Sequence, residues 1–232
     1  MGAIFSIAID GPSGAGKSTV AKAVAQRMRA MYLDTGAMYR AIGLKAMRLG
    51  APLDEESALA AILDNTALEV HCSVNGAPVI LLDGENVTET LRRQDVGDAA
   101  SHVSALPVVR AWLLDKQRAL AASGNVIMDG RDIGTQVLPN AEVKIYLTAS
   151  PKVRAQRRVD QLKEKGLNAD YDTVLREVCE RDERDMNRAI SPLRRADDAH
   201  LVDSSDMTIP EVVAAIMKYV NQAEAKADDA DI

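Results

Sequence analysis

The sequence predicts an α/β protein whose five parallel strands form one doubly wound sheet, and two observations lead to this prediction. The first is a set of five short, almost continuously apolar runs, which is typical of strands covered on both faces. These runs span residues 4–9, 30–33, 126–128, 143–147 and 200–202. The second is that helical patterns lie between the runs, in the alternation of a doubly wound fold. One helix begins at Ser150-Pro151, since serine caps a helix and proline suits its first turn.

Two stretches interrupt this alternation. Between residues 34 and 125, the β-like runs 68–74 and 78–82 flank Asn75-Gly76, a strong hairpin signal, and a second turn is expected at Asp83-Gly84. We therefore expect a small antiparallel β patch there. Residues 152–195 are highly charged and arginine-rich, and their pattern predicts helices. From residue 223 onward the chain is small and acidic, which predicts a disordered tail.

Composition limits the classes of partner. The chain has 232 residues, enough for one generous domain, and its 28 basic and 34 acidic residues give a net charge of −6. This balance argues against binding to nucleic acid, which needs a net basic face. No apolar run is long enough to span a membrane, and the two cysteines have no metal-binding spacing. We expect a cytoplasmic monomer whose partners are small molecules rather than nucleic acid or membrane.

A glycine-rich loop follows the first predicted strand and opens a helix. Its glycines allow successive backbone N–H groups to point at phosphate oxygens, and the helix N-terminus favours negative charge at the same place. Lys17 would reach the β- and γ-phosphates of a nucleoside triphosphate, and Ser18 would bind Mg²⁺. Asp129, at the end of the third predicted strand, is expected to help hold that ion. The candidate nucleotide contacts are Gly11, Pro12, Ser13, Gly14, Ala15, Gly16, Lys17, Ser18 and Thr19.

The molecule that receives the phosphate is less evident from this loop, which suits a nucleotide switch as well as a transferase. The Asn-Lys-x-Asp and Asp-x-x-Gly motifs of GTP switches do not occur in the chain, whereas arginines are abundant. Two phosphates brought together in a cleft of reduced dielectric repel each other by several kcal/mol, and guanidinium groups neutralise that repulsion. An acceptor phosphate needs no general base, because its attacking oxygen is already ionised. The arginines concerned are Arg40, Arg110, Arg131, Arg154, Arg157, Arg158, Arg181, Arg184 and Arg188.

The segment 181–188 tests this idea. On a helix, Arg181, Asp185 and Arg188 share one narrow face, at the edge of an apolar stripe that includes Val174 and Met186. Taken alone, the segment is explained more simply by a solvated face with Arg–Asp pairs one turn apart. The same holds for the arginines near residue 154.

Four segments carry a resemblance to a known family, in the order in which they occur: 9–19, 33–40, 129–135 and 180–188. Together they resemble the bacterial cytidylate kinases of the nucleoside monophosphate kinase superfamily, over about residues 4 to 220. The phosphate-binding loop is generic. The Asp-Gly-Arg-Asp run from Asp129 and the Arg-x-x-x-Asp-x-x-Arg run from Arg181 are more specific, and they favour a functional role for the Arg181 face.

The resemblance implies phosphoryl transfer from ATP to CMP or dCMP with Mg²⁺, in pyrimidine nucleotide metabolism. It also implies a P-loop kinase domain over residues 1–222, in three parts. The core would comprise 1–36, 125–150 and 196–222, with a monophosphate-binding insert at 37–124 and a helical lid at 151–195. The alternatives are a small P-loop kinase for another monophosphate or a hydroxylated metabolite, and a nucleotide-binding regulator without turnover.

By the same resemblance, individual residues acquire expected roles. Asp132 is our candidate for the partner of cytosine N4, because a carboxylate accepts from that amino group and disfavours the oxygen of uracil. Thr35 stands where the family often has serine, so the hydroxyl is kept. The expected acceptor contacts are Thr35, Arg40, Ser101, Arg110, Arg131, Asp132, Arg181, Asp185 and Arg188. The expected catalytic residues are Lys17, Arg131, Arg157 and Arg188, with Arg157 preferred over Arg154 and Arg158 for the ATP phosphates.

Overall fold

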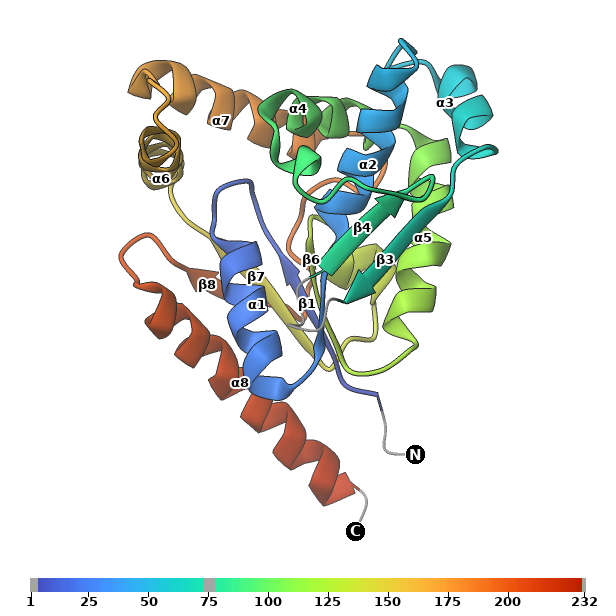
Figure 1. The fold of residues 1–232 in the computed structure, drawn as a ribbon. Coiled ribbons are helices and arrows are strands. Elements are labelled where there is room, and N and C mark those ends of the chain that lie inside the picture. Colours follow the sequence, from blue (N-terminus) through green and yellow to red (C-terminus); the bar gives the residue numbers. More distant parts are fainter. Residues whose placement is uncertain (1–3, 73–77, 231–232) are drawn as a thin grey trace.

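The computed structural model describes residues 4–72 and 78–230, and its centre is one sheet of five parallel strands (Figure 1). The order in space is β2-β6-β1-β7-β8, so that β1 lies in the middle. This confirms the five strands predicted from the apolar runs. Their bounds are β1 Ser6–Asp10, β2 Met31–Asp34, β6 Val126–Gly130, β7 Val143–Thr148 and β8 His200–Asp203.

Helices cover both faces of this sheet. Along β1, Ile7 and Ile9 pack in one apolar cluster with α1 (Lys17–Met28) and α8 (Ile209–Ala230). Ala8 between them belongs to a second cluster on the opposite face, with α2 (Thr35–Arg48) and α5 (Pro107–Ala121). Since successive strand residues point to opposite faces, two covered faces require apolar residues at every position. The near-continuous runs in the sequence therefore reflect a doubly wound fold.

The stretch between β2 and β6 forms its own small sheet. Strands β3 (Leu68–Cys72), β4 (Pro78–Leu82) and β5 (Glu85–Asn86) pair antiparallel in that order, which confirms the expected β patch. Asp83 and Gly84 connect β4 to β5 with positive φ angles of 52° and 83°, as a tight hairpin turn requires. The other expected turn, at Asn75-Gly76, lies outside the described residues. The helical elements of this stretch are α2, α3 (Glu56–Leu63), η1 (Thr90–Arg92), α4 (Gln94–Val103) and α5.

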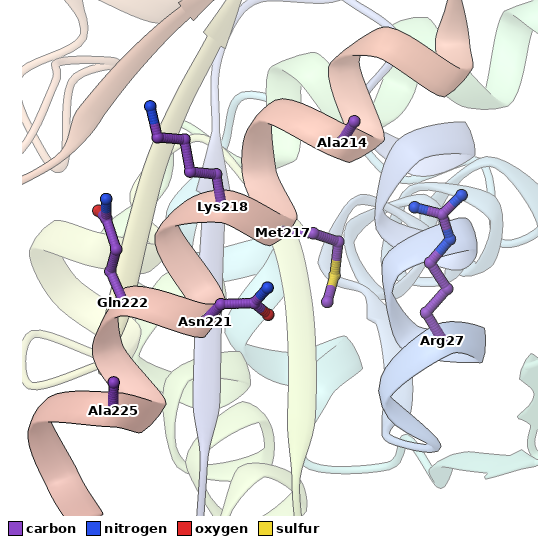
Figure 2. Close-up of a pocket in the computed structure, with 7 residues that line it drawn as sticks. All are labelled: Arg27, Ala214, Met217, Lys218, Asn221, Gln222 and Ala225. Carbon is purple, nitrogen blue, oxygen red and sulfur yellow. The ribbon is translucent and has the colours of Figure 1, made fainter.

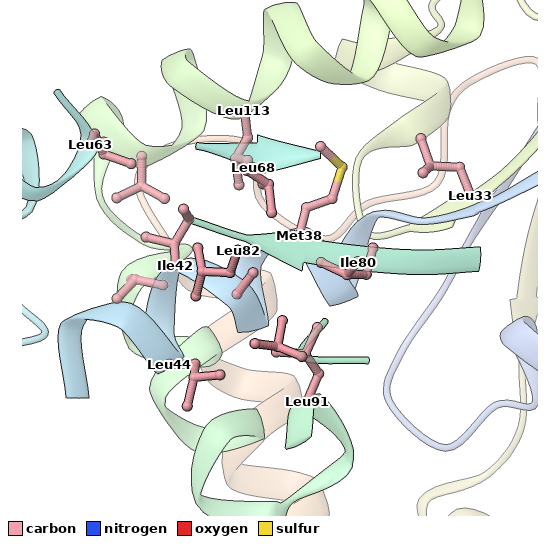
Figure 3. Packing of buried hydrophobic residues seen from close by; sticks show 14 of the residues in the cluster. Leu33, Met38, Ile42, Leu44, Leu63, Leu68, Ile80, Leu82, Leu91 and Leu113 are labelled. Carbon is pink, nitrogen blue, oxygen red and sulfur yellow. The ribbon is translucent and has the colours of Figure 1, made fainter. Parts of the chain in front are cut away.

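One hydrophobic core joins this stretch to the main sheet. Leu33 of β2 belongs to the same buried cluster as Ile42 of α2, Leu82 of β4 and Leu113 of α5 (Figure 3). Each of these four side chains is at most 1% exposed. The residues expected as an insert are therefore packed onto the sheet by continuous apolar contact.

The arginine-rich stretch after β7 is helical, as predicted. It consists of α6 (Pro151–Glu164) and α7 (Tyr171–Asn187), whose N-termini are capped by Ser150 and Asp170. We keep the name lid segment for residues 151–195. Its apolar cluster is small, with Ala155, Val159 and Val174 as the buried members. A short π-helix, η2 (Ile133–Val137), follows β6.

The C-terminal segment differs from the prediction. Helix α8 continues to Ala230, so the prediction of a disordered tail from residue 223 is wrong for residues 223–230. The reason is local: this part of the sequence contains alanine, glutamate and lysine, which are good helix formers, and neither glycine nor proline to end the helix. None of the helices in the described part of the chain is long and apolar enough to cross a membrane.

The shared core predicts cooperative unfolding. Replacing Leu82 with alanine removes a side chain that is 1% exposed and leaves a cavity, so we expect a loss of about 2–5 kcal/mol in the free energy of unfolding. Urea unfolding followed by the fluorescence of Trp112 in α5 and by far-UV circular dichroism should give one coincident transition. Leu49→Ala, at a position 62% exposed, is the control and should change stability by less than about 0.5 kcal/mol. Two separate transitions would contradict a single core.

Candidate active site

A cavity of about 960 Å³ opens at the carboxyl ends of the parallel strands. Its walls come from the loop between β1 and α1, from α2, α4 and α5, from the β6–η2 turn, and from both helices of the lid segment. The carboxyl edge of a doubly wound sheet is where ligands usually bind. A second, open groove of about 580 Å³ lies between α1 and α8 and includes Arg27 and Met217 (Figure 2), but none of the predicted site residues lines it.

The glycine-rich loop forms the floor of the cavity. Residues 13–19 line it, and α1 begins at Lys17, so its first N–H groups have no acceptors within the helix. Such a helix start is an anion site. Gly11 and Pro12 do not belong to the lining. A Cβ atom on Gly11 would lie 1.9 Å from the Leu147 carbonyl oxygen of β7, so only glycine fits there.

Lys17 is buried at the edge of this loop. Its Nζ donates to the Pro12 carbonyl at 2.8 Å. Burial, and secondly the nearby Arg131 guanidinium, lower the pKa of Lys17 to about 7. An anion placed beside Lys17 would raise that pKa again, because opposite charge favours the protonated amine.

Two oxygen-bearing side chains meet beside the loop. Ser18 Oγ donates to Asp129 Oδ2 at 2.7 Å, and the Tyr32 hydroxyl donates to Asp129 Oδ1 at 3.0 Å. Burial raises the pKa of Asp129 to about 6, helped by Asp34, its register partner on β2. The hydroxyl of Thr35 donates to the Asp129 carbonyl at 2.8 Å.

In the wall of the cavity, arginines and aspartates from α5, the β6–η2 turn and α7 are paired. Arg131 Nε donates to Asp185 Oδ2 of α7 at 2.8 Å, and Arg110 of α5 pairs with Asp132. Burial alone would raise the pKa of Asp185, but Arg131 lowers it on balance. Arg188 Nη2 lies 3.7 Å from Asp132 Oδ1, within ion-pair range but beyond hydrogen-bond distance.

Several donors in this wall have no partner. Among the side chains that the structure describes, five buried polar atoms lack a hydrogen bond, and four of them belong to cavity-lining residues. Leaving a buried donor unsatisfied costs about 1–3 kcal/mol, so a group of four is a signature of a polar ligand. The four atoms are Ser101 Oγ, Arg110 Nε, Arg181 Nε and Arg188 Nη2. Burial, followed by Arg131, also lowers the pKa of Arg181 to about 10.

Comparison with known proteins shows the family of the chain. A family model for cytidylate kinase matches residues 7–222. The chain belongs to the cytidylate kinase family. The cytidylate kinase of Geobacillus sp. (strain WCH70) is 47% identical over 216 residues, covering 93% of this chain and 96% of that protein. The cytidylate kinase of Caldicellulosiruptor saccharolyticus is 48% identical over 214 residues, covering 92% and 94%. A solved structure of an uncharacterized protein from Eubacterium ventriosum is similar in fold alone, with a TM-score of 0.52 and 16% identity over 95% of this chain and 99% of that one.

In this cytidylate kinase family member, the residues expected to contact the acceptor all line the cavity. Thr35 uses its hydroxyl proton on the Asp129 carbonyl, so its hydroxyl is left as an acceptor. The face of α7 is not a solvated stripe, since Asp185 is buried and Arg131 pairs with it. The prediction of an apolar stripe along this helix is wrong at Met186, whose side chain is 48% exposed. Buried carboxylates occupy part of the inward face of this helix instead.

The three arginines of α6 have different environments. Arg154 is 2% exposed, and its guanidinium is already engaged by Asp182 of α7, by the Ala149 carbonyl and by the Ser13 carbonyl. Arg157 donates to the Ser204 carbonyl at 2.6 Å, and Arg158 contacts Gln94 of α4. All three line the cavity.

Some cavity residues were not predicted. Asp182 does not line the cavity itself, but it pairs with the lining residue Arg154, and this pairing depends on how α6 and α7 pack. The loop between β8 and α8 contributes Ser204, Met207 and Thr208, which carry no motif. Tyr39 lies one turn after Thr35 in α2. The guanidinium carbon of Arg110 stands over its ring, 5.5 Å from the ring centroid. Their placement comes from tertiary packing, which local pattern does not encode.

The burial of Asp129 predicts a pH-dependent stability difference. Its pKa rises from 3.8 to about 6 in the folded state, so wild-type stability falls as pH increases through that window. The Asp129→Asn variant has no carboxyl group at this position, so it lacks this titration. Relative to wild type, we expect the nucleotide-free variant to gain stability from pH 4 to 6, reaching a benefit of about 1–3 kcal/mol above pH 6. Urea unfolding at pH 4.5, 6 and 7.5 measures this, with exposed Asp64→Asn as control. A benefit that does not grow with pH would contradict it.

Proposed function

We propose that this protein transfers the γ-phosphoryl group of ATP to CMP or dCMP, giving ADP and CDP or dCDP. The observation that carries the proposal is one cavity whose lining contains both a phosphate-binding loop and four residues with unpaired buried donors. Such a cavity suits two anionic nucleotides meeting at their phosphates. Membership of the cytidylate kinase family supports the choice of a cytidine nucleotide as acceptor.

The acceptor phosphate and sugar would satisfy the unpaired donors. We assign Arg40, Arg110 and Arg131 to the phosphate, because guanidinium groups hold phosphate oxygens in bidentate fashion and offset the repulsion between the two nucleotides. Ser101, Arg181 and Asp185 are assigned to the sugar, whose hydroxyl groups can both donate and accept. The Thr35 hydroxyl oxygen, in the wall of the same cavity, would accept a hydrogen bond from the nucleotide, either directly or through a water molecule.

The cytosine base would meet Asp132. This carboxylate is held by Arg110 and flanked by Arg188, so it can accept from the N4 amino group without moving. Uracil carries an oxygen at the same position and would face the carboxylate unfavourably. Arg188 Nη2, which has no hydrogen-bond partner, is placed to donate to an acceptor on the ring or on the transferring group.

Catalysis would rest on positioning and charge. The attacking phosphate oxygen is already ionised, so no side chain has to remove a proton. Lys17, Arg131, Arg157 and Arg188 would stabilise the charge that moves between the two phosphates. Arg157 of α6 lines the cavity and donates hydrogen bonds to Ser204. It can exchange these for hydrogen bonds to a nucleotide phosphate. Phosphates beside Lys17 would restore its full charge.

The residues beside the loop also suit Mg²⁺. Ser18 Oγ and Asp129 Oδ2 are 2.7 Å apart, and hydroxyl and carboxylate oxygens are the ligands that this ion prefers. We propose that these two residues hold it, directly or through water. When bound, Mg²⁺ would neutralise charge on the ATP phosphates.

The partners we propose are small nucleotides. Although the chain is acidic overall, arginines from the insert, the β6–η2 turn and the lid segment are gathered in the cavity. Positive charge confined to a cavity suits a small anion rather than nucleic acid. We also propose, from the sequence, that the protein is a cytoplasmic monomer.

The acceptor preference tests the proposal directly. In a coupled assay of ADP formation, kcat/KM for CMP or dCMP should exceed that for UMP, AMP and GMP by at least about tenfold, because a carboxylate facing the wrong base edge is left unpaired. A preference for AMP or UMP would support another monophosphate kinase. Binding of ATP without ADP formation for any acceptor would support a regulator without turnover.

Ser101→Ala separates a ligand contact from a structural one. Since Ser101 Oγ is buried and unpaired, its removal should not lower the melting temperature of the nucleotide-free protein. It should raise the KM for CMP about 2- to 10-fold, with the KM for ATP unchanged, because one hydrogen bond to the sugar is lost. Ser123→Ala, whose exposed hydroxyl bonds only the Leu120 carbonyl, is the control. Loss of stability with an unchanged KM would contradict the assignment.

A further inference from the structure

A buried carboxylate at the end of β1 is not used by the function proposed above. Asp10 is 4% exposed and directly precedes Gly11, where the phosphate-binding loop begins. Its Oδ1 accepts from the Ile133 N–H at 2.8 Å and its Oδ2 from the Gly134 N–H at 2.7 Å. Both oxygens are thus engaged by the first two N–H groups of η2, which a helix start leaves without partners in the helix itself.

These contacts fix the turn that carries Arg131 and Asp132. On one side of the turn, Gly130 is the register partner of Asp10 in the β1–β6 pair. On the other side, Ile133 and Gly134 are bonded to the Asp10 side chain. The chain is thus held by Asp10 of β1 both just before and just after Arg131 and Asp132.

We infer that Asp10 is a positioning residue, which sets the geometry of the acceptor-binding Arg131-Asp132 turn relative to the phosphate-binding loop. This inference rests on the proposed function, because it concerns the same cavity. In-line transfer requires the donor and acceptor phosphates to be placed within a few tenths of an ångström, and a misplacement of 1 Å can reduce the rate about a hundredfold. Asp10 joins the two segments that hold them, which lie more than 120 residues apart in the chain.

The chemistry of this position requires a carboxylate. Two parallel N–H donors need two acceptors, and asparagine would offer one acceptor and one amide that faces a donor. Burial also raises the pKa of Asp10 to about 6, so the charged form is unfavourable for the fold. A residue selected for stability alone would not need that charge, which is consistent with a role in the site.

The test compares Asp10→Asn with Glu142→Gln in steady-state kinetics with ATP and CMP. Glu142 is the matched control: its carboxylate also accepts from a β1 backbone group, the Ser6 N–H at 2.6 Å, but at the end of the strand away from the cavity. We expect Asp10→Asn to lower kcat/KM for CMP about 10- to 100-fold, while the dissociation constant for ATP changes less than about threefold. Glu142→Gln should keep the wild-type values. Equal kinetics in the two variants, or an equal loss of ATP and CMP binding, would overturn the inference.

A double-mutant cycle shows whether Asp10 acts through the turn. In a background that carries both Arg131→Ala and Asp132→Ala, treated as one change to the turn, adding Asp10→Asn should reduce kcat/KM by less than about threefold, because both side chains being positioned are already absent. Fully additive effects would overturn the inference. If Asp10→Asn does not fold, Asp10→Ser, which keeps one shorter acceptor, is carried through the same cycle with the same expectation. A wild-type protein inactive with CMP would overturn the proposed function itself, which distinguishes the two failures.

Discussion

The structure depends on keeping a dense group of positive charges stable inside one cavity. Three of the guanidinium groups that would repel each other are paired with a carboxylate: Arg131 with Asp185, Arg110 with Asp132, and Arg154 with Asp182. A buried pair of this kind contributes little net stability, but removing one member leaves an uncompensated charge. The pairs therefore do not explain why the fold is stable. They explain how arginines can be buried in the cavity wall without a ligand while specific N–H groups remain unpaired and available to bind one.

Groups in the wall of this cavity and at the end of the adjoining strand β1 carry charges that the fold disfavours. Burial raises the pKa of Asp10 and Asp129 and lowers that of Lys17. A protein shaped by stability alone would replace such groups with apolar ones, and groups with shifted pKa values collect where chemistry occurs. The large apolar clusters on both faces of the sheet offset this cost, since they extend without interruption to the strands that carry the site.

Much of the fold could be predicted because it is encoded locally. The apolar runs and the glycine-rich loop are each contained in a few consecutive residues, so the five strands and the floor of the cavity followed from the sequence. The partner of Asp10 lies 123 residues away, and the burial of Arg154 depends on α7, so neither had a local signal. The tail from residue 223 was misjudged from its acidic composition, although its helix-forming residues favoured continuation of α8. Residue types alone also could not decide whether Arg181 faced solvent or cavity.

Which part of the molecule can move follows from how each part is attached. The stretch between β2 and β6 shares the main core, so displacing it would expose Leu82 and Leu113. The lid segment instead has a small cluster of its own and meets the rest largely through polar contacts, such as Arg157 with Ser204 and Arg158 with Gln94. Polar contacts can be exchanged for water or for a nucleotide phosphate at little net change in free energy, whereas apolar contacts cannot. Helices α6 and α7, which lie beside the cavity and contribute arginines to its lining, are therefore the part of the wall attached with the least apolar contact.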